Sequence, residues 1–535
     1  MSHEISGRHL IDGQWRATSG ADTFQSSDPA TGETLPPAFP EASERDVDDA
    51  LRAASTAFEV FLDLPPRWTA DLLDAIADRI MDLGDALLDR AGRETALPKP
   101  RLVGERARTC NQLKMFAALV REGSWVDAVI DRADPNRAPM PKPDVRRVLR
   151  PRGPVVVFGA SNFPFAFGTA GGDTASALAA GNPVVVKGHP SHPGTSELFA
   201  AAVLDALRAC KLPTGLFTLL QGKRHELSAM LVRHASTEAV GFTGSQRAGR
   251  ALFDLAASRP RPIPVYAEMG SLNPVVLLPG ALSERGETIA KDLAGSVLLG
   301  GGQFCTKPGV IFAIGERASQ FVDLLSEQIK SAAPVTMLNS NLRENFSSRA
   351  GTAAKTSGVQ TLVEAKPSGA ASMSPGLMRT TSDVWAKESE LHEEVFGPAA
   401  LVVECKSVDE ACDAVRHVGG SLTGTVHVGA NDPQASVAHV VRTLEQHAGR
   451  VIVNGYPTGV EVCHAIVHGG PYPATTDAGT TSVGTAAIRR FVRMTAYQDT
   501  PGALLPPALQ DANPLGIERT IDGQRTREAV TRSWA

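Results

Sequence analysis

Short apolar segments separated by helical segments occupy the middle of this sequence, and they restrict its fold more than any other feature. The apolar segments are residues 155–158, 184–186, 217–220, 239–242 and 264–267. Continuous apolar runs of this length are typical of strands that are buried on both faces of a sheet. Helices between such strands form right-handed crossovers, so the pattern predicts an α/β fold with a parallel, doubly wound sheet.

The chain is too long for one core, and a second alternating region follows the first. Single cores rarely grow beyond ~250–300 residues, and this chain has 535. The second alternation runs from Asn273 to about Gly455. Within it, residues 365–382 are rich in Ser, Gly and Ala, which indicates a surface loop. We expect two α/β units, a proline-rich connecting arm at 135–153, and a tail at 478–535 without an obvious core of its own.

The N-terminal part carries signals for a hairpin and for helices. Asp12-Gly13 is a hairpin turn signal. The sequence Ser43-Glu-Arg-Asp46 resembles a capping box that opens a helix. Apolar residues at positions 73, 76, 80 and 83 repeat at helical spacing and predict one buried helix face.

Composition argues against several classes of function. A formal net charge of −5 is unlike the strongly basic balance of nucleic-acid-binding domains. No run of ~18 apolar residues is present, and the first residues lack an apolar segment of the signal-peptide type. The six cysteines are scattered and form no CxxC pair, which favours free thiols in a reducing compartment. We therefore expect a cytoplasmic protein without nucleic-acid or membrane partners.

The segment Gly300-Gly-Gly-Gln-Phe-Cys305-Thr-Lys-Pro-Gly309 is the clearest candidate for chemistry. A Gly-rich turn can leave a cysteine among backbone N–H groups, and such surroundings lower the pKa of a thiol. This interpretation makes Cys305 a nucleophile. The alternative is a small buried apolar residue, the usual role of a free cysteine.

Two further polar residues follow predicted strands, where doubly wound sheets bind their ligands. Glu268 is a candidate general base whose pKa would be raised toward neutrality by burial; the alternative is a solvated loop glutamate. Asn162 is a candidate hydrogen-bond donor to an oxyanion, or else an ordinary turn asparagine. The stretch around Asn162 does not contain a GxGxxG fingerprint.

Six motifs occur in an order that resembles the aldehyde dehydrogenase superfamily. They are Asn162 before Phe-Pro, Lys187 ending Val-Val-Val-Lys, Gly241-Phe-Thr-Gly-Ser245, Glu268, Gly302-Gln-Phe-Cys305, and Glu393-Glu394-Val-Phe396-Gly-Pro398. The match covers most of the chain. It implies a Rossmann-type cofactor domain (1–134 and 154–269), an α/β catalytic domain (270–465), and an oligomerisation arm with a C-terminal tail (135–153 and 466–535).

The resemblance implies a role for each position. Cys305 is similar to the nucleophile, Glu268 to the base that activates the deacylating water, and Asn162, with the backbone N–H of Cys305, to the oxyanion hole. The positions similar to cofactor-binding residues are Lys187 at the adenosine ribose, Ser245 at the pyrophosphate, Glu394 and Phe396 at the nicotinamide ribose, and Phe158 and Gly241.

The ribose site departs from the pattern of NAD-preferring members. Many of them carry an acidic residue three positions after the strand lysine, and here that position is Pro190. Without that carboxylate a 2′-phosphate is not repelled, and Lys223, Arg224 or His225 could approach it. We predict NADP as the preferred cofactor, with NAD also possible.

Four segments resemble one branch, the α-ketoglutaric semialdehyde (2,5-dioxovalerate) dehydrogenases, to which the fatty aldehyde dehydrogenase of luminous bacteria is similar. The segments start at Phe165, Lys187, Phe304 and His468. The resemblance implies oxidation of 2,5-dioxopentanoate to 2-oxoglutarate. The alternatives are a medium- or long-chain aldehyde as substrate, or a non-catalytic relative of the fold. A dicarbonyl acid would need a cationic anchor, which the sequence alone does not identify.

His464 and His468 stand four residues apart beside Cys463, but no further ligand cluster accompanies them, so we predict no metal. His468 is instead predicted to line the active site and to modulate Cys305. Segments near 145–149 and 482–492 resemble the oligomerisation segments of the family. We therefore expect a homodimer or a dimer of dimers.

Overall fold

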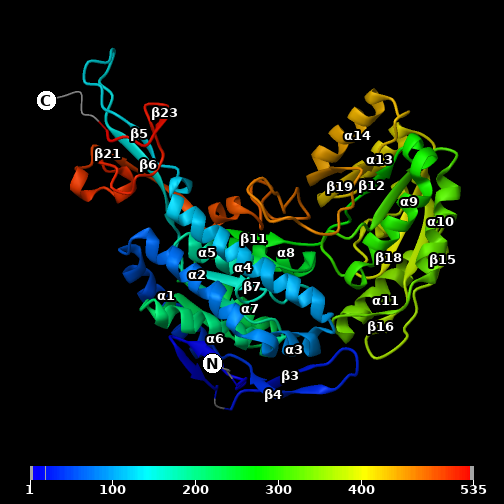
Figure 1. Cartoon of the computed structure of the whole chain (residues 1–535), viewed down its shortest axis with the longest axis horizontal. Helices are drawn as coiled ribbons and strands as arrows, with labels where there is room; N and C mark the ends of the chain where they lie inside the picture. The colour runs from blue at the N-terminus through cyan, green and yellow to red at the C-terminus, as the bar shows by residue number, and fades with distance from the viewer. Residues whose placement is uncertain (1–3, 19, 531–535) are drawn as a thin grey trace.

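The computed structural model describes residues 4–18 and 20–530. Two α/β lobes lie side by side, and a smaller sheet projects from the first lobe (Figure 1). Residues 1–3, at the start of the predicted cofactor domain, and 531–535, at the end of the predicted tail, lie outside the described residues. No helix of the described ranges is long and apolar enough to cross a membrane.

Seven strands form the sheet of the first lobe. Their order is β11-β10-β7-β8-β9-β1-β2, with bounds Val265–Glu268, Ala239–Thr243, Val155–Phe158, Val184–Lys187, Phe217–Leu220, His9–Ile11 and Gln14–Arg16. The first five are parallel neighbours, so the predicted parallel sheet is confirmed. The predicted hairpin is also confirmed: β1 and β2 pair antiparallel beside β9, and Asp12 and Gly13 have φ of 46° and 72°, as its turn requires.

Helices cover both faces of this sheet, as a doubly wound fold requires. One face packs on α2 (Pro66–Asp82), α3 (Gly84–Thr95), α4 (Lys99–Glu122), α5 (Gly172–Ala179) and α6 (Pro193–Ala209). The other face packs on α1 (Glu44–Leu62), α7 (His225–Arg233) and α8 (Gln246–Ala257). Val155 and Val157 join the first core, whereas Val156 and Phe158 join the second. This alternation explains why all four residues of β7 are apolar.

The predicted capping box is confirmed at the start of α1. Ser43 Oγ accepts a hydrogen bond from Asp46 N at 3.2 Å, and Asp46 Oδ2 accepts one from Ser43 N at 2.8 Å. A cap of this kind contributes about 1 kcal/mol. The predicted apolar face on α2 is confirmed as well, since Leu73, Ile76 and Ile80 are fully buried.

The second lobe contains another seven-stranded sheet. Its order is β15-β17-β18-β13-β12-β19-β20, with bounds Gln360–Val363, Gly376–Thr381, Ala399–Cys405, Val310–Ile314, Val275–Leu277, Ser421–His427 and Ala448–Val453. One face packs on α9 (Pro279–Leu298) and α10 (Ala318–Ser331). The opposite face packs on α12 (Ser382–Lys387), α13 (Val408–Arg416) and α14 (Gln434–His447). The second alternation is therefore confirmed as a mainly parallel sheet.

The expectation of a surface loop at 365–382 is wrong for its second half. β17 lies inside the second sheet and pairs with β18 along its whole length, and Leu377 is fully buried. The Ser- and Gly-rich composition hid this strand because only two of its residues are apolar. The ladder and the burial of Leu377, about 2 kcal/mol, come from strands that are distant in sequence.

A five-stranded sheet forms the projecting arm (Figure 1). Its order is β21-β6-β5-β22-β23, with bounds Val492–Gln498, Val145–Pro151, Val129–Asp131, Arg519–Ile521 and Gln524–Thr526. Leu505, Leu509 and Ile517 of the tail pack against Ile130 and Val148 of the arm. The tail thus has no separate core but shares one with the arm. β5 precedes the expected boundary at residue 134 and nevertheless pairs with this sheet.

Smaller elements complete the fold. The short strands are β3 (Thr23–Ser27), β4 (Thr34–Pro40), β14 (Val335–Thr336) and β16 (Ser372–Met373), and the remaining α-helix is α11 (Ser340–Lys355). The 3-10 helices are η1 (Ser124–Val126), η2 (Thr214–Leu216), η3 (Leu299–Gly302), η4 (Ser389–His392), η5 (Thr485–Phe491), η6 (Gly502–Leu504) and η7 (Pro507–Leu509).

Candidate active site

Cys305 lies just after a turn that only glycine can form. Gly300, Gly301 and Gly302 have φ of 58°, 69° and 65°, a left-handed conformation that costs other residues about 1–2 kcal/mol each. A Cβ on Gly302 would also lie 2.2 Å from the carbonyl oxygen of Gly397. These glycines let the chain reverse between α9 and Cys305.

Glu268, His468 and Cys305 converge at this point from distant parts of the chain. Cys305 Sγ lies 3.4 Å from His468 Nε2, which lies 3.1 Å from Glu268 Oε1. Ser482 Oγ donates a hydrogen bond to Glu268 Oε2. Glu268 ends β11, whereas His468 and Ser482 come from the stretch between β20 and η5. The cluster joins a nucleophile-type side chain to a carboxylate and an imidazole.

The segment around His468 is fixed by backbone contacts. Met269 N donates to Ala474 O at 2.7 Å, which ties this segment to the end of β11. His468 N donates to Thr481 Oγ1 at 2.9 Å, and Ser482 N donates to His468 O at 2.8 Å. The His468 side chain is 1% exposed and therefore has one well-defined position.

The predicted acidic thiol is wrong for this arrangement. Burial, reinforced by the negative charge of Glu268, raises the pKa of Cys305 well above its usual value, and the positive charge of Arg108 opposes this. The sequence argument considered only the backbone N–H groups of the turn. It did not include a buried carboxylate beside the sulfur.

The predicted direction for Glu268 is also wrong. Burial alone would raise the pKa of its carboxyl group. The charge of His468, together with hydrogen bonds from His468, Ser482 and Cys305, outweighs burial, so the pKa of Glu268 is lowered. Glu268 is consequently ionised at neutral pH.

Asn162 lies against the segment that carries Cys305. Its side-chain Nδ2 donates to Gln303 O at 2.9 Å, and its own carbonyl accepts a bond from Arg101 Nη2 at 2.8 Å. In the described part of the chain, the backbone N–H of Cys305 takes part in no hydrogen bond. The segment that carries Cys305 therefore holds two donors of the type that binds an oxyanion, the Asn162 amide against Gln303 and the Cys305 N–H.

Two residues that the sequence analysis did not assign support the Cys305 segment. Asn273 Nδ2 donates to the carbonyls of Cys305 and Lys307 at 2.8 and 2.9 Å. Its φ of 50° is one that asparagine tolerates better than most residues. Lys307 Nζ donates to Val395 O and Ala399 O, both at 2.8 Å. Lys307 follows Cys305 by two positions, which was the only sequence signal for it.

Lys187 and its neighbours form a polar cluster at the ends of β8 and β9. Lys187 Nζ donates to Gly222 O at 2.7 Å. Burial lowers the pKa of Lys187 to about 8, opposed by the charge of Glu41. Both Glu41 oxygens accept the backbone N–H of Lys223 at 3.1 Å. The carboxyl ends of parallel strands are where dinucleotides bind, so the cluster fits an adenosine ribose.

Ser245 is the N-cap of α8 and accepts a hydrogen bond from Ala248 N at 3.3 Å. The first turn of a helix leaves further N–H groups unpaired, and these suit a pyrophosphate. Gly241 lies in β10, where a Cβ would meet Asp173 Oδ2 at 3.0 Å. Phe158 is 6% exposed and its ring packs 6.4 Å from that of Phe242. Phe158 thus lies on the face of the sheet that α8 covers, whereas Gly241 faces α5 on the opposite side.

Glu394 and Phe396 lie near the Cys305 segment but apart from Lys187. A Cβ on Gly270 would lie 2.6 Å from Glu394 Oε2. Burial raises the pKa of Glu394, and the charge of Lys307 opposes this. Phe396 is partly buried. The predicted cofactor-binding residues therefore run from Lys187 past Ser245 to Glu394, which leads toward Cys305.

Arg224 and His464, two other residues considered in the sequence analysis, lie on the surface. Arg224 is exposed and forms an ion pair with Asp22, with which a 2′-phosphate would compete. His464 is exposed and its Nδ1 lies 3.2 Å from Thr485 Oγ1. His468 faces Cys305 and Glu268 instead, and the three ligand atoms lie within 4.8 Å of one another.

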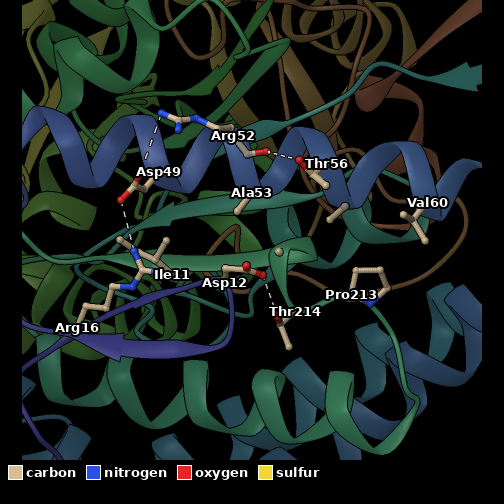
Figure 2. A pocket seen from close by; sticks show the side chains of 12 residues that line it. Ile11, Asp12, Arg16, Asp49, Arg52, Ala53, Thr56, Val60, Pro213 and Thr214 are labelled. Carbon is tan, nitrogen blue, oxygen red and sulfur yellow. Dashed lines mark hydrogen bonds and ion pairs between the residues drawn. The ribbon is translucent and has the colours of Figure 1, made fainter.

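A groove of about 450 Å³ lies elsewhere, between α1, the β1–β2 hairpin and residues 213–215 (Figure 2). Its charged side chains pair with one another: Arg16 Nη1 lies 3.4 Å from Asp49 Oδ2, and Asp12 accepts a bond from Thr214 Oγ1 at 2.9 Å. None of the predicted site residues lines it. We therefore assign no chemistry to this groove.

Comparison with known proteins agrees with this geometry. The sequence model of the Aldehyde dehydrogenase family matches residues 15–493. The chain belongs to the aldehyde dehydrogenase family. It is an NAD(P)-dependent enzyme that acts on an aldehyde.

Two relatives match over nearly the full length. Alpha-ketoglutaric semialdehyde dehydrogenase 2 of Azospirillum brasilense is 45% identical over 524 residues, covering 97% of this chain and 99% of the relative. Alpha-ketoglutaric semialdehyde dehydrogenase of Acinetobacter baylyi is 42% identical over 528 residues, covering 98% and 99%. The resemblance to this branch of aldehyde dehydrogenases is thereby confirmed.

Solved structures support the fold. Aldehyde dehydrogenase C of Pseudomonas syringae, as a mutant in complex with NAD+ and octanal, superposes with a TM-score of 0.76. The match covers 94% of this chain and 99% of that chain, at 21% sequence identity. The aldehyde dehydrogenase fold predicted from the sequence is confirmed.

Proposed function

We propose that this aldehyde dehydrogenase oxidises 2,5-dioxopentanoate to 2-oxoglutarate by covalent catalysis at Cys305, with NADP as its preferred cofactor. The main observation in support is that Cys305, His468 and Glu268 converge. Cys305 Sγ lies 3.4 Å from His468 Nε2, and His468 Nε2 lies 3.1 Å from Glu268 Oε1. A sulfur next to a carboxylate that can take its proton suits nucleophilic attack on a carbonyl.

The first step is addition of the sulfur to the aldehyde carbon. The thiol proton passes to Glu268, which accepts a hydrogen bond from Cys305, and is then released to solvent. His468 Nε2 directs its own N–H at Glu268 Oε1. The carbonyl oxygen becomes an oxyanion and is bound by the Asn162 amide and the Cys305 backbone N–H. Preorganised donors of this kind contribute more than most other groups to catalysis of acyl transfer.

The cofactor supplies hydride acceptance when it is bound. Lys187 would bind its adenosine ribose, the N-terminus of α8 at Ser245 its pyrophosphate, and Glu394 its nicotinamide ribose. With the cofactor held there, the Cys305 adduct would lose a hydride and become a thioester.

Hydrolysis of the thioester is the last step. Glu268 is ionised at neutral pH and accepts a proton from the attacking water. Ser482 and His468 position its carboxylate. The acid leaves and the sulfur regains its proton. Cys305→Ala is expected to abolish NADPH formation, whereas a non-catalytic relative of the fold would show no activity even with Cys305 intact.

The substrate proposal rests on the names of the two full-length relatives, both α-ketoglutaric semialdehyde dehydrogenases. NADPH formation by the purified enzyme with 2,5-dioxopentanoate, succinic semialdehyde and decanal tests it. The highest kcat/KM is expected with 2,5-dioxopentanoate. A clear preference for decanal would favour the medium- or long-chain alternative and refute the proposed substrate.

The preference for NADP is supported by the surroundings of Lys187. Pro190 replaces an acidic residue, and the exposed side chains of Lys223 and Arg224 follow Gly222 directly. Initial rates with each cofactor are expected to give a higher kcat/KM for NADP. Arg224→Ala is expected to lower the value for NADP but not for NAD; equal losses for both cofactors would contradict a 2′-phosphate contact.

The arm supports assembly into a homodimer or homotetramer. β21 is an edge strand of the arm sheet, and Met494 on it is 65% exposed. Leu504 of the tail is 73% exposed. Apolar side chains on an unpaired edge favour pairing with a second copy.

All six cysteines are free thiols, which supports a reducing compartment such as the cytoplasm.

A further inference from the structure

Three arginines act electrostatically on the site or contact its loops. Two of them donate hydrogen bonds to loop carbonyls, although each keeps one buried nitrogen without a partner, Arg101 Nη1 and Arg450 Nε. Arg101 Nη2 donates to Asn162 O at 2.8 Å, and its guanidinium stacks 4.6 Å from the ring centre of Phe304. Arg450 Nη2 donates to the carbonyls of Pro457 and Gly459 at 2.8 and 3.0 Å. Both residues therefore hold loops around Cys305.

Arg108, on α4, differs from these two arginines because its guanidinium donates no hydrogen bond to the described residues. Its Nε and Nη2 atoms are buried without a hydrogen-bond partner. Within residues 4–18 and 20–530, its guanidinium makes neither a hydrogen bond nor an ion pair. It lies against two neighbouring aromatic rings, 5.7 Å from the centre of Phe163 and 5.5 Å from that of Phe167.

The rings of Phe167 and His468 connect Arg108 with the reacting sulfur. The Phe167 ring that it contacts lies 5.9 Å from the His468 ring, and His468 Nε2 lies 3.4 Å from Cys305 Sγ. The charge of Arg108 acts on both Cys305 and Glu268. Both rings beside Arg108 belong to an apolar cluster that also includes Phe304 and Val483.

A buried guanidinium without a partner is unfavourable, because it has lost water and gained no compensating anion. The nearest carboxylate along the helix, Glu105, does not supply one. Its Oε1 accepts bonds from Phe165 N and Ala166 N at 2.8 and 3.0 Å. Burial raises the pKa of Glu105, which favours its neutral form. A carboxylate on a ligand would compensate Arg108, since it can accept two parallel N–H bonds.

We propose that Arg108 binds the carboxylate of the substrate and selects aldehydes that carry a carboxylate a few carbons from the reacting carbonyl. The carbons between the two ends would contact Phe163, Phe167 and Val483. This inference rests on the proposed function, because it assumes that the substrate is an aldehyde of a carboxylic acid.

The test compares two aldehydes of equal length, 5-oxopentanoate and pentanal, in the wild type and in Arg108→Met. The variant is expected to raise KM for 5-oxopentanoate about 10- to 100-fold, the range for one charge-assisted pair. Its kcat for 5-oxopentanoate and its kcat/KM for pentanal are expected to stay within about threefold. Arg108→Lys keeps the charge but not the planar fork, so an intermediate KM is expected.

Arg106→Met is the matched control, because Arg106 lies on the same helix and donates to Gly84 O at 2.8 Å, a contact outside the active site. It is expected to leave the ratio of the two KM values unchanged. An equal loss with both aldehydes in Arg108→Met would show that Arg108 acts through the fold or through Cys305 and not on the substrate carboxylate, and would overturn the proposal.

Calorimetric titration with 2-oxoglutarate separates this inference from the proposed function. The wild type is expected to bind it, and Arg108→Met to bind it at least about tenfold more weakly. If the wild type binds 2-oxoglutarate through Arg108 but does not oxidise 2,5-dioxopentanoate, the proposed substrate fails and the anchor stands. If neither affinity nor KM depends on Arg108, the anchor fails whatever the substrate.

Discussion

Ser482 controls the protonation of Glu268, and Ser482→Ala tests this relation. Ser482 Oγ donates to Glu268 Oε2 and also lies 3.0 Å from His468 O. The bond to Glu268 stabilises the ionised carboxylate and is one of the causes of its lowered pKa. Removing the hydroxyl therefore raises the pKa of Glu268.

The size of the change follows from the geometry. A hydrogen bond to a charged group contributes about 1.5–3 kcal/mol, which corresponds to about 1–2 pKa units at 1.36 kcal/mol per unit. Ser482 has one hydroxyl proton, which it can also donate to His468 O. We therefore expect the pKa of Glu268 to rise by about one unit, toward the lower end of that range.

The measurement is the pH dependence of thioester hydrolysis, followed as the single-turnover release of acid from the acylated enzyme. Its acid limb reports the ionisation of the base and is expected to move to higher pH in Ser482→Ala. Ser196→Ala is the control, because that buried hydroxyl donates only to His192 O, at 3.1 Å. An acid limb that stays in place, or moves to lower pH, would refute this account of Glu268.

Three further predictions concern other parts of the molecule. Burial lowers the pKa of Lys187 from 10.5 to about 8, so the unfolded state binds more protons, and wild-type stability should rise with pH between these values. Lys187→Met should remove this pH dependence, raise the unfolding free energy at neutral pH by about 1–3 kcal/mol in urea titrations, and weaken NADP binding. Met494→Glu places a charge on the exposed edge strand and should shift the assembly toward monomers in light scattering; an unchanged mass would argue against β21 as an interface. Zn²⁺ should inhibit reversibly, because separations of 3.4 and 3.1 Å suit tetrahedral ligands about 2.0–2.3 Å from the metal. His468→Gln should weaken this inhibition about tenfold, and inhibition that survives it and resists a chelator would contradict the site.

The strands of the first sheet could be predicted because their signal is local. Each residue of Val155–Phe158 is buried on one face or the other, so the run is apolar throughout. β17 could not be predicted in this way. Its sequence Gly376-Leu-Met-Arg-Thr-Thr is half polar, and it is a strand because β15 and β18 flank it. Pairing with strands that are distant in sequence therefore determines the conformation of β17, which its local propensity does not.

The residues of the candidate site also fall into those with a local sequence signal and those without one. Cys305, Glu268 and Asn162 stand next to glycines or strand ends, where a sequence pattern is visible. Ser482 lies 214 residues from Glu268, and Arg108 lies within a long helix whose sequence contains several arginines. Nothing local distinguishes them. Their roles arise only from which atoms they meet in the folded chain.

The raised pKa of Cys305 means that the proposed mechanism needs a base beside the sulfur. Cys305 and Glu268 cannot both be ionised cheaply in one buried cluster, and Glu268 holds the charge because His468 and Ser482 bind it. A thiol of raised pKa forms little thiolate, and the higher intrinsic nucleophilicity of that thiolate offsets only part of the loss. Glu268, which accepts a hydrogen bond from Cys305, is the base that takes the proton. General-base activation by the cluster therefore replaces the backbone N–H groups as the reason why Cys305 can react.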